Sequence, residues 1–174
     1  MRDPAGAARV DSSHEATNAV VRVVDDGGHP VALARPATRV VSLIPSVTEM
    51  VVALGAAPQL VGRTDYDVAP EVRALPSVGG GLDPSVEAIV ALKPDLVVTW
   101  AHDAKQQTRA RLAALGVPTF SLATEDTSDV HRGLARLGTL LGRDAAAAAT
   151  SARLRAAFDA VRRSVAGRPR PRTM

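Results

Sequence analysis

The side chains that could do chemistry in this sequence are few and scattered. Trp100 is the only tryptophan and Tyr66 the only tyrosine among 174 residues. Of the four histidines, only His102 beside Asp103 is a candidate metal ligand, and it is not part of a zinc-binding spacing such as H-E-x-x-H. The sequence has no cysteine, no G-x-S-x-G nucleophile elbow and no phosphate-binding G-K-[ST]. These residue types predict binding without catalysis, and neither a metal site nor a cofactor.

The distribution of charge narrows the classes of partner. The formal charge is +3, but five of the 21 Lys and Arg lie in residues 162–172, so residues 1–161 carry 16 basic against 18 acidic side chains. A body without excess positive charge and with 2% aromatics disfavours nucleic-acid binding. Residues 1–18 lack the apolar core of a signal peptide, and no apolar run reaches the roughly 18 residues of a membrane span. We therefore expect no direct membrane insertion.

Hydrophobic patterning predicts strands that alternate with helices. Short apolar runs rich in β-branched residues are expected to be strands at 39–43, 60–64, 95–100 and 117–122. Helical periodicity predicts helices at 46–55, 82–92, 104–116, 129–142 and 144–166. Two β-rich runs around Asp-Asp-Gly-Gly indicate a hairpin over 20–33. The prediction is an α/β, doubly wound fold with about four parallel strands, flanking helices, an N-terminal β-hairpin and a long C-terminal helix.

Capping signals predict where two of these helices begin. Ser46 and Glu49 have the S-x-x-E spacing of a capping box. Asp83 followed by Pro84 is typical of an N-cap and the first helical position. We therefore expect helices to start at these two points.

Glu87 lies in the first turn of the second helix. Val86, Ile89 and Val90 form its predicted buried stripe, so Glu87 is expected on the exposed face. An acidic side chain there interacts favourably with the helix dipole. The residues alone favour a solvated glutamate with no further role.

The carboxyl ends of the predicted strands share one edge of the sheet, where doubly wound folds bind ligands. Pro45 and Ser46 follow the first strand, Tyr66 follows the second, and Trp100 closes the third. Because the chain has only four Phe, Tyr and Trp residues, two of them at adjacent strand ends favour an apolar ligand surface. Packing between loops is the alternative, and the pattern leaves both open.

Four segments in order resemble a known family. They are "RVVSLIPSVTEMVVALGA", "LVGRTDYDVAPEV", "LPSVGGGLDPSVEAIVALKPDLVVTW" and "LGVPTFSL". They look like the N-terminal lobe of class III solute-binding proteins, which serve ABC importers of cobalamin, iron–siderophore complexes and haem. The resemblance covers about residues 20–166, and "EAIVALKPDLV" is its most diagnostic part.

The resemblance implies two α/β lobes joined by one long helix, with the ligand between them. It divides the chain into a flexible lead over 1–18, a ligand-binding lobe over 19–142 and the backbone helix over 143–167. Residues 168–174 would be the truncated start of a missing second lobe. The family is extracytoplasmic, although this chain shows no signal peptide.

The resemblance also implies roles for particular residues. Glu87 stands where family members have a glutamate that docks onto arginines of the ABC permease. Tyr66 and Trp100 stand where the cobalamin-binding branch packs aromatics on the corrin. A further aromatic of that branch is replaced by the glycines at 79–81, which leaves room for an iron chelate. The rest of the half-site would come from backbone at Pro45, Ser46 and Gly80.

The sequence therefore predicts a non-enzymatic, substrate-binding component of an ABC importer for cobalamin or a ferric siderophore, present as one lobe. Haem is an alternative ligand, because haem binders of the family use a tyrosine ligand in this lobe and Tyr66 could serve. An alternative of another class is a stand-alone cytoplasmic flavodoxin-like regulatory domain. The predicted partners are a small metal chelate or corrinoid and the permease.

Overall fold

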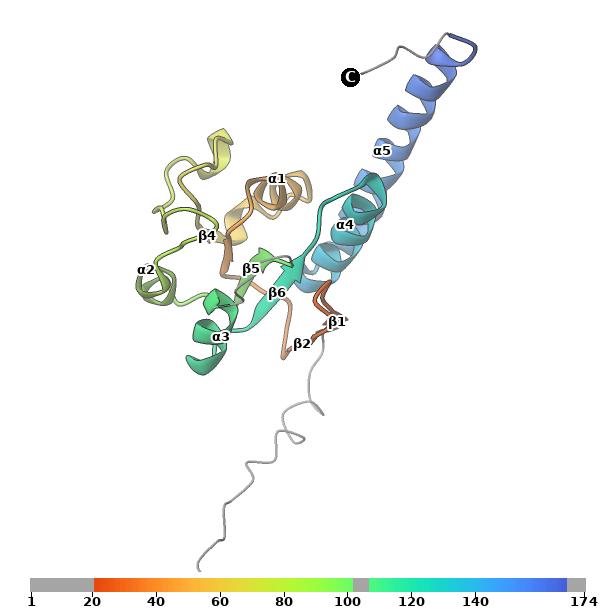
Figure 1. Cartoon of the computed structure of the whole chain (residues 1–174). Helices are drawn as coiled ribbons and strands as arrows, with labels where there is room; N and C mark the ends of the chain where they lie inside the picture. The colour runs from red at the N-terminus through yellow and green to blue at the C-terminus, as the bar shows by residue number, and fades with distance from the viewer. Residues whose placement is uncertain (1–20, 102–106, 169–174) are drawn as a thin grey trace, which may run out of the picture.

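A four-stranded sheet forms the centre of the protein, for which the computed structural model describes residues 21–101 and 107–168. Its strand order is β4-β3-β5-β6, and every neighbouring pair is parallel. The strands are β3 (Val40–Ser42), β4 (Leu60–Gly62), β5 (Leu96–Trp100) and β6 (Thr119–Leu122). The alternating pattern predicts this sheet, and the α/β fold class is confirmed (Figure 1).

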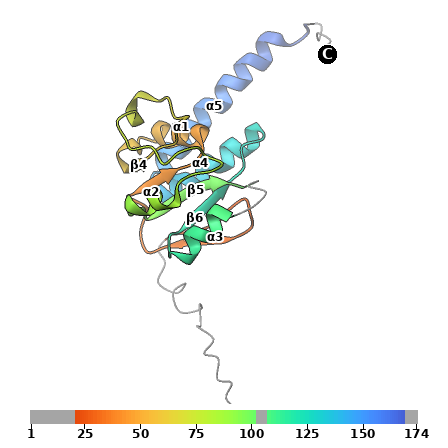
Figure 2. The ribbon, with the colours of Figure 1, turned by 60° about the vertical axis from the view of Figure 1, so that its left-hand side comes forward.

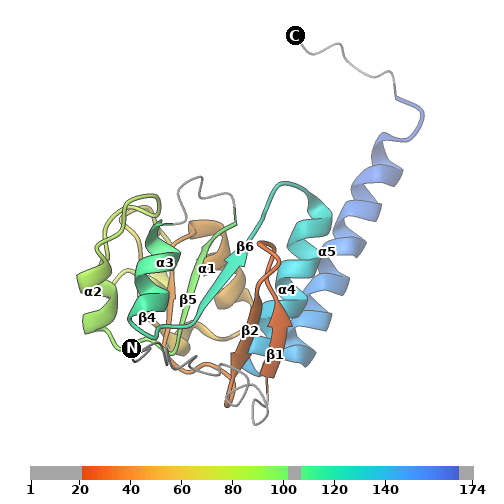
Figure 3. The same cartoon turned by 60° about the horizontal axis from the view of Figure 1, so that its bottom comes forward.

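Helices cover both faces of the sheet (Figure 3). The helices of one face are α1 (Pro45–Ala53) and α4 (Thr127–Leu141), and those of the other are α2 (Val86–Ala91) and α3 (Gln107–Ala114). Successive side chains of a strand point to opposite faces. Val40 of β3 accordingly packs in one hydrophobic cluster and Val41 in the other. The doubly wound arrangement follows from strands that are apolar on both faces.

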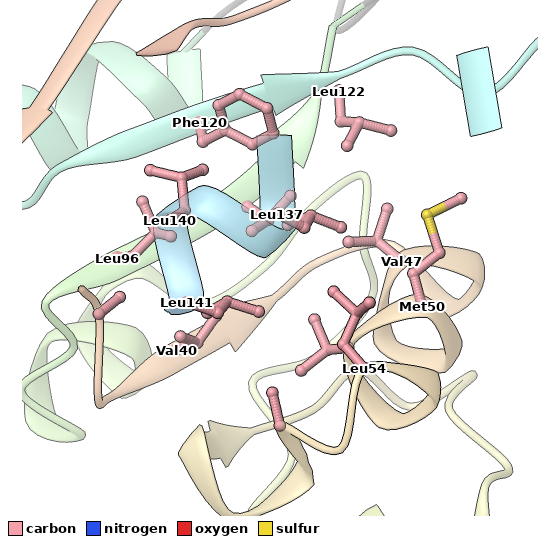
Figure 4. Close-up of a cluster of buried hydrophobic side chains, with 14 of the residues drawn as sticks. Val40, Val47, Met50, Leu54, Leu96, Phe120, Leu122, Leu137, Leu140 and Leu141 are labelled. Atoms are coloured by element: carbon pink, nitrogen blue, oxygen red, sulfur yellow. The ribbon is translucent and has the colours of Figure 1, made fainter. Parts of the chain in front are cut away.

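The larger cluster lies between the sheet, α1 and α4 (Figure 4). Leu96 and Phe120 of the sheet meet Leu137 of α4, and Val47 and Leu54 of α1 complete the contact. These side chains are almost fully buried. Burial of apolar area at about 25 cal/mol per Å² stabilises this face of the sheet and holds the carboxyl strand ends in place.

The predicted N-terminal hairpin is confirmed. Strands β1 (Val21–Val24) and β2 (Pro30–Leu33) pair antiparallel and form a separate two-stranded sheet. The hairpin packs against α4, and Val21, Val31 and Leu33 join the larger cluster. Its turn lies next to β6, where it forms the polar contacts described below.

The last helix, α5 (Asp144–Val165), packs on α4 through its first turns only. Gly138 of α4 makes this close approach possible, because a Cβ there would lie 2.6 Å from the Cβ of Ala147. Beyond these turns α5 extends away from the rest of the molecule (Figures 1 and 2). Phe158 is 38% exposed, and Val161 and Val165 are exposed as well. The division into lobe and backbone helix remains a prediction.

Both predicted capping assignments are wrong, although α1 begins within one residue of its predicted start. Ile44 occupies the N-cap position of α1 without a side-chain cap, and Ser46 is an exposed residue inside the helix. The N-cap of α2 is Ser85, whose hydroxyl accepts a 3.1 Å hydrogen bond from the N–H of Ala88. Asp83 lies in the loop before the helix. The capping side chain nearest to the helix, that of Ser85, therefore sets the start of α2. Proline occupies the first position of α1, and this helix begins without a side-chain cap.

Some predictions fall outside the described residues. They concern the lead over 1–18, the pair His102 and Asp103, and residues 168–174 apart from Arg168. Among the helices that the structure does describe, none combines the length and the apolar character needed to cross a bilayer.

Candidate functional site

A cleft of about 590 Å³ lies where β3, β4 and β5 end. Its walls come from the segments that follow these strands and from the loop before α2: Leu43, Pro45, Tyr66, Gly80, Gly81, Leu82, Asp83 and Trp100. Four of the five predicted ligand contacts, namely Pro45, Tyr66, Gly80 and Trp100, thus line one cleft. Ser46 does not line it.

A tight turn after β4 presents Tyr66 at the cleft. Thr64 and Asp67 are buried in this turn. The carboxylate of Asp67 accepts hydrogen bonds from the backbone N–H of Thr64 at 2.6 Å and from its hydroxyl at 2.7 Å. The Thr64 hydroxyl in turn accepts one from the N–H of Tyr66 at 3.3 Å. The polar groups of Thr64 and Asp67 stabilise the turn. The side chain of Tyr66 is not needed to hold the turn together, and it remains 70% exposed.

Trp100 is the last residue of β5 and is paired with Leu122 of β6. The four residues before it are buried, whereas 40% of Trp100 is exposed. Leu82, from the loop before α2, is 85% exposed in the same cleft. Burial of apolar surface is favourable by about 25 cal/mol per Å², and the exposed area of these side chains does not contribute this free energy. A ligand that covers these side chains would recover that free energy.

Glycines bring the loop before α2 against the sheet edge. A Cβ on Gly81 would lie 2.2 Å from the carbonyl oxygen of Leu43, so the loop can approach β3 this closely only with glycine at this position. Gly80 differs, because its Cβ would meet Tyr66 at an ordinary 3.7 Å. The backbone of Gly81 therefore closes the cleft, and the space beside Gly80 stays open.

Sequence reasoning missed Leu43, Leu82 and Asp83 as lining residues, whereas Gly81 belongs to the glycine run that was expected to complete the half-site. The pattern places Leu82 and Asp83 at the start of the predicted helix over 82–92, with Asp83 as its N-cap, and therefore not in the cleft. The glycine run at 79–81 is the available signal, since consecutive glycines in a loop allow close backbone approach.

Glu87 lies outside this cleft, on the surface between α2 and α3. Its carboxylate accepts a 3.0 Å hydrogen bond from the guanidinium of Arg111 on α3 and a 3.4 Å one from the hydroxyl of Ser85. A hydrogen bond from its own backbone N–H and the charge of Arg111 lower the pKa of Glu87. Glu87 and Arg111 flank an open groove of about 480 Å³, so the predicted docking residue is solvated but already has a partner within the chain.

A buried polar network joins the hairpin to the sheet on the far side of Trp100. The side chain of Asp25 is fully buried and accepts hydrogen bonds from Arg109 of α3, from the N–H of Ser121 at 3.2 Å and from the N–H of His29 at 2.7 Å. Burial opposes the charge, but these bonds outweigh it and lower the pKa of Asp25. Within residues 21–101 and 107–168, no group of three His, Cys, Asp or Glu is placed to hold a metal ion.

The model of the periplasmic binding protein family matches residues 40–174. The chain belongs to this family. Over 88 residues it is 42% identical to vitamin B12-binding proteins of Yersinia pestis and Yersinia pseudotuberculosis, a match that spans 50% of this chain and 31% of theirs.

Several solved structures share this fold. A periplasmic solute-binding protein of Veillonella parvula superposes with a TM-score of 0.74 at 21% identity, over 86% of this chain and 49% of that one. The periplasmic vitamin B12-binding protein of Vibrio cholerae gives 0.68 at 26% identity, over 76% and 52%. A periplasmic haem-binding protein of Pseudomonas aeruginosa gives 0.67 at 30% identity, over 78% and 50%. The present chain thus spans about half the length of each of these three proteins.

Proposed function

We propose that this chain is the ligand-contacting lobe of the extracytoplasmic substrate-binding component of an ABC importer, whose cargo is a corrinoid or a ferric siderophore. Tyr66 and Trp100 pack against the ligand, and the backbone at Pro45 and Gly80 shapes the space around it. The ligand is carried as cargo, so the lobe needs neither a catalytic group nor a cofactor. Family membership favours this function over a stand-alone flavodoxin-like regulator.

The observation that carries the proposal is the apolar cleft with exposed aromatics at the ends of parallel strands. Tyr66, Leu82 and Trp100 come from three separate segments and share this one cleft. A flat, largely apolar macrocycle or chelate would cover all three. Half a binding site holds such a ligand weakly, since a second lobe would supply the remaining burial.

Glu87 is proposed as the contact to the permease. Its carboxylate is exposed, lowered in pKa and outside the ligand cleft, so a partner can reach it while ligand is bound. An arginine of the partner would replace or join Arg111 as its counter-ion. The role itself comes from the family resemblance.

Haem is the second candidate ligand, and one observation favours it. The ring of Tyr66 is 70% exposed at the cleft, where its phenolic oxygen could coordinate iron. The haem-binding relative from Pseudomonas aeruginosa is also 30% identical to this chain. Replacement of Tyr66 by Phe separates the candidates, because it removes the iron ligand and keeps the apolar ring.

Trp100 allows a direct test, since it is the only tryptophan in the chain. We expect saturable quenching of its fluorescence when the protein is titrated with cyanocobalamin, ferrichrome or haem, with one chelate clearly preferred. Free N-acetyltryptophanamide in parallel titrations corrects for absorption by the coloured ligands. Quenching that stays linear and equal to that of the free fluorophore for all three probes would contradict the proposal.

A further inference from the structure

Asp83 is the charged residue in the lining of the cleft, whose other described members are neutral: Leu43, Pro45, Tyr66, Gly80, Gly81, Leu82 and Trp100. No Lys, Arg or His is among these described lining residues. Among its described lining residues, the cleft therefore presents one negative charge beside an apolar surface. A ligand bound there brings its own polar substituents next to that charge.

The Asp83 carboxylate has no structural role within the described part of the chain. It does not cap α2, because Ser85 does. The side chain is exposed, and within the described part of the chain no donor hydrogen-bonds to it. A buried carboxylate usually has partners, and an exposed one needs none. Asp83 is thus available to a ligand without the loss of an existing contact.

Two other carboxylates near the cleft are occupied. Asp65 accepts a hydrogen bond from the hydroxyl of Ser77, and Asp67 accepts two from Thr64. These bonds hold the turn that presents Tyr66. Asp83 differs from both because its loop is held through backbone instead, by the bridge between Gly79 and Pro84 on either side of it.

We propose that Asp83 is a specificity-determining residue that selects ligands with neutral hydrogen-bond donors, such as carboxamide groups, and disfavours ligands with carboxylates at the same place. This inference rests on the proposed function, since it assumes that a ligand occupies the cleft. An amide N–H donates to the carboxylate, and a hydrogen bond to a charged group is stronger than a neutral one. A ligand carboxylate is repelled by Asp83, and none of the described lining side chains carries a positive charge to offset that repulsion.

Ligand pairs in which one member carries a carboxylate that the other lacks test the proposal. Cyanocobalamin is compared with a monocarboxylic acid made by hydrolysis of one of its amide arms, and haem with its dimethyl ester. We expect the unsubstituted protein to prefer the member without the added or free carboxylate in at least one pair by about tenfold in Kd. The preference should shrink at high salt, where charges at an exposed site are screened.

Asp83→Asn keeps the size of the side chain and removes its charge. We expect this variant to bind both members of the pair within about twofold of each other. Glu49→Gln is the matched control, because it removes one exposed negative charge from α1 at a position that does not line the cleft. That control should keep the tenfold preference.

Two results overturn the inference in different ways. Ligand binding with the same preference in Asp83→Asn as in the unsubstituted protein assigns the selectivity elsewhere and leaves the proposed function intact. Failure of every member of both pairs to bind overturns the proposed function together with the inference that depends on it.

Discussion

Trp100 separates two regions at the carboxyl edge of the sheet that treat polar groups in opposite ways. On one side lies the cleft, where Tyr66 and Trp100 are exposed and Asp83 has no partner among the described residues. On the other side, Asp25 is fully buried and bound to Arg109. Trp100 borders the cleft and also a small cavity next to Arg109, so the two regions are direct neighbours.

The difference shows that the Asp25 network stabilises the fold, whereas the cleft leaves surface exposed for binding. Each charge in the Asp25 network has partners inside the chain, and such a network rigidifies the edge of the sheet. The cleft leaves apolar area uncovered and a carboxylate without a partner among the described residues, and neither stabilises the described fold. Exposed, unpartnered groups beside a rigid, satisfied network are what a preorganised binding site requires.

Loss of the Asp25 side chain should have the largest effect. Asp25→Ala leaves Arg109 and the N–H of Ser121 without their acceptor, and breaking a buried pair in this way costs about 3 kcal/mol. Urea unfolding followed by circular dichroism measures the change. Asp159→Ala, on the exposed part of α5, is the matched control and should leave the midpoint unchanged. Equal midpoints for Asp25→Ala and the unsubstituted protein would mean that the network is not structural.

Removal of the Trp100 side chain should weaken ligand binding with little effect on the network. We expect Trp100→Ala to raise the Kd of the preferred chelate about tenfold, because a central aromatic contact contributes about 1.4 kcal/mol. Equilibrium dialysis gives the affinity without a fluorescent probe. Phe158→Ala is the control, since Phe158 is similarly exposed but lies on α5. An unchanged Kd in Trp100→Ala would show that Trp100 serves in packing and not in ligand binding.

Acid should remove the stability that the charge of Asp25 contributes to the network. The pKa of Asp25 is lowered in the folded protein, so its charge contributes stability above the unfolded-state pKa of about 3.9, and this stability is lost as the pH falls through the folded-state value. Asp25→Asn cannot titrate at this position. The difference in urea midpoint between the two proteins should therefore narrow as the pH falls below about 4. A difference that stays constant down to about pH 3 would contradict this account.

Glu87 should matter least to the isolated chain. The Glu87–Arg111 pair is exposed, and solvent and salt screen such pairs, so Glu87→Gln should change neither the urea midpoint nor the ligand affinity measurably. Arg111→Gln breaks the same pair from the other side. If Glu87 docks onto a permease, only Glu87→Gln should impair binding to permease-containing vesicles. Equal losses in both variants would assign the effect to the intrachain pair.

Much of the fold was accessible from local sequence because its signals are local. Apolar runs such as 95–100 can pack on both faces only inside a parallel sheet, and Gly142 separates the last two helices. The predicted cap of α2 was wrong because several side chains compete for that position and the backbone path selects one, whereas α1 begins at Pro45 without any side-chain cap. Ser85 caps α2 since the bridge between Gly79 and Pro84 places the preceding residues in a loop.

What the sequence determined by itself was the parallel sheet and therefore the segments at its carboxyl edge. This was enough to predict Pro45, Tyr66 and Trp100 as ligand contacts. The carboxyl end of every parallel strand faces the crevice, so the prediction does not require the strand order. Tertiary structure alone decided which groups remain available. Asp25 meets Ser121 across 96 positions of sequence and Glu87 meets Arg111 across 24, whereas Asp83 meets no described partner. Such pairing depends on three-dimensional approach, and no local pattern of residues encodes it.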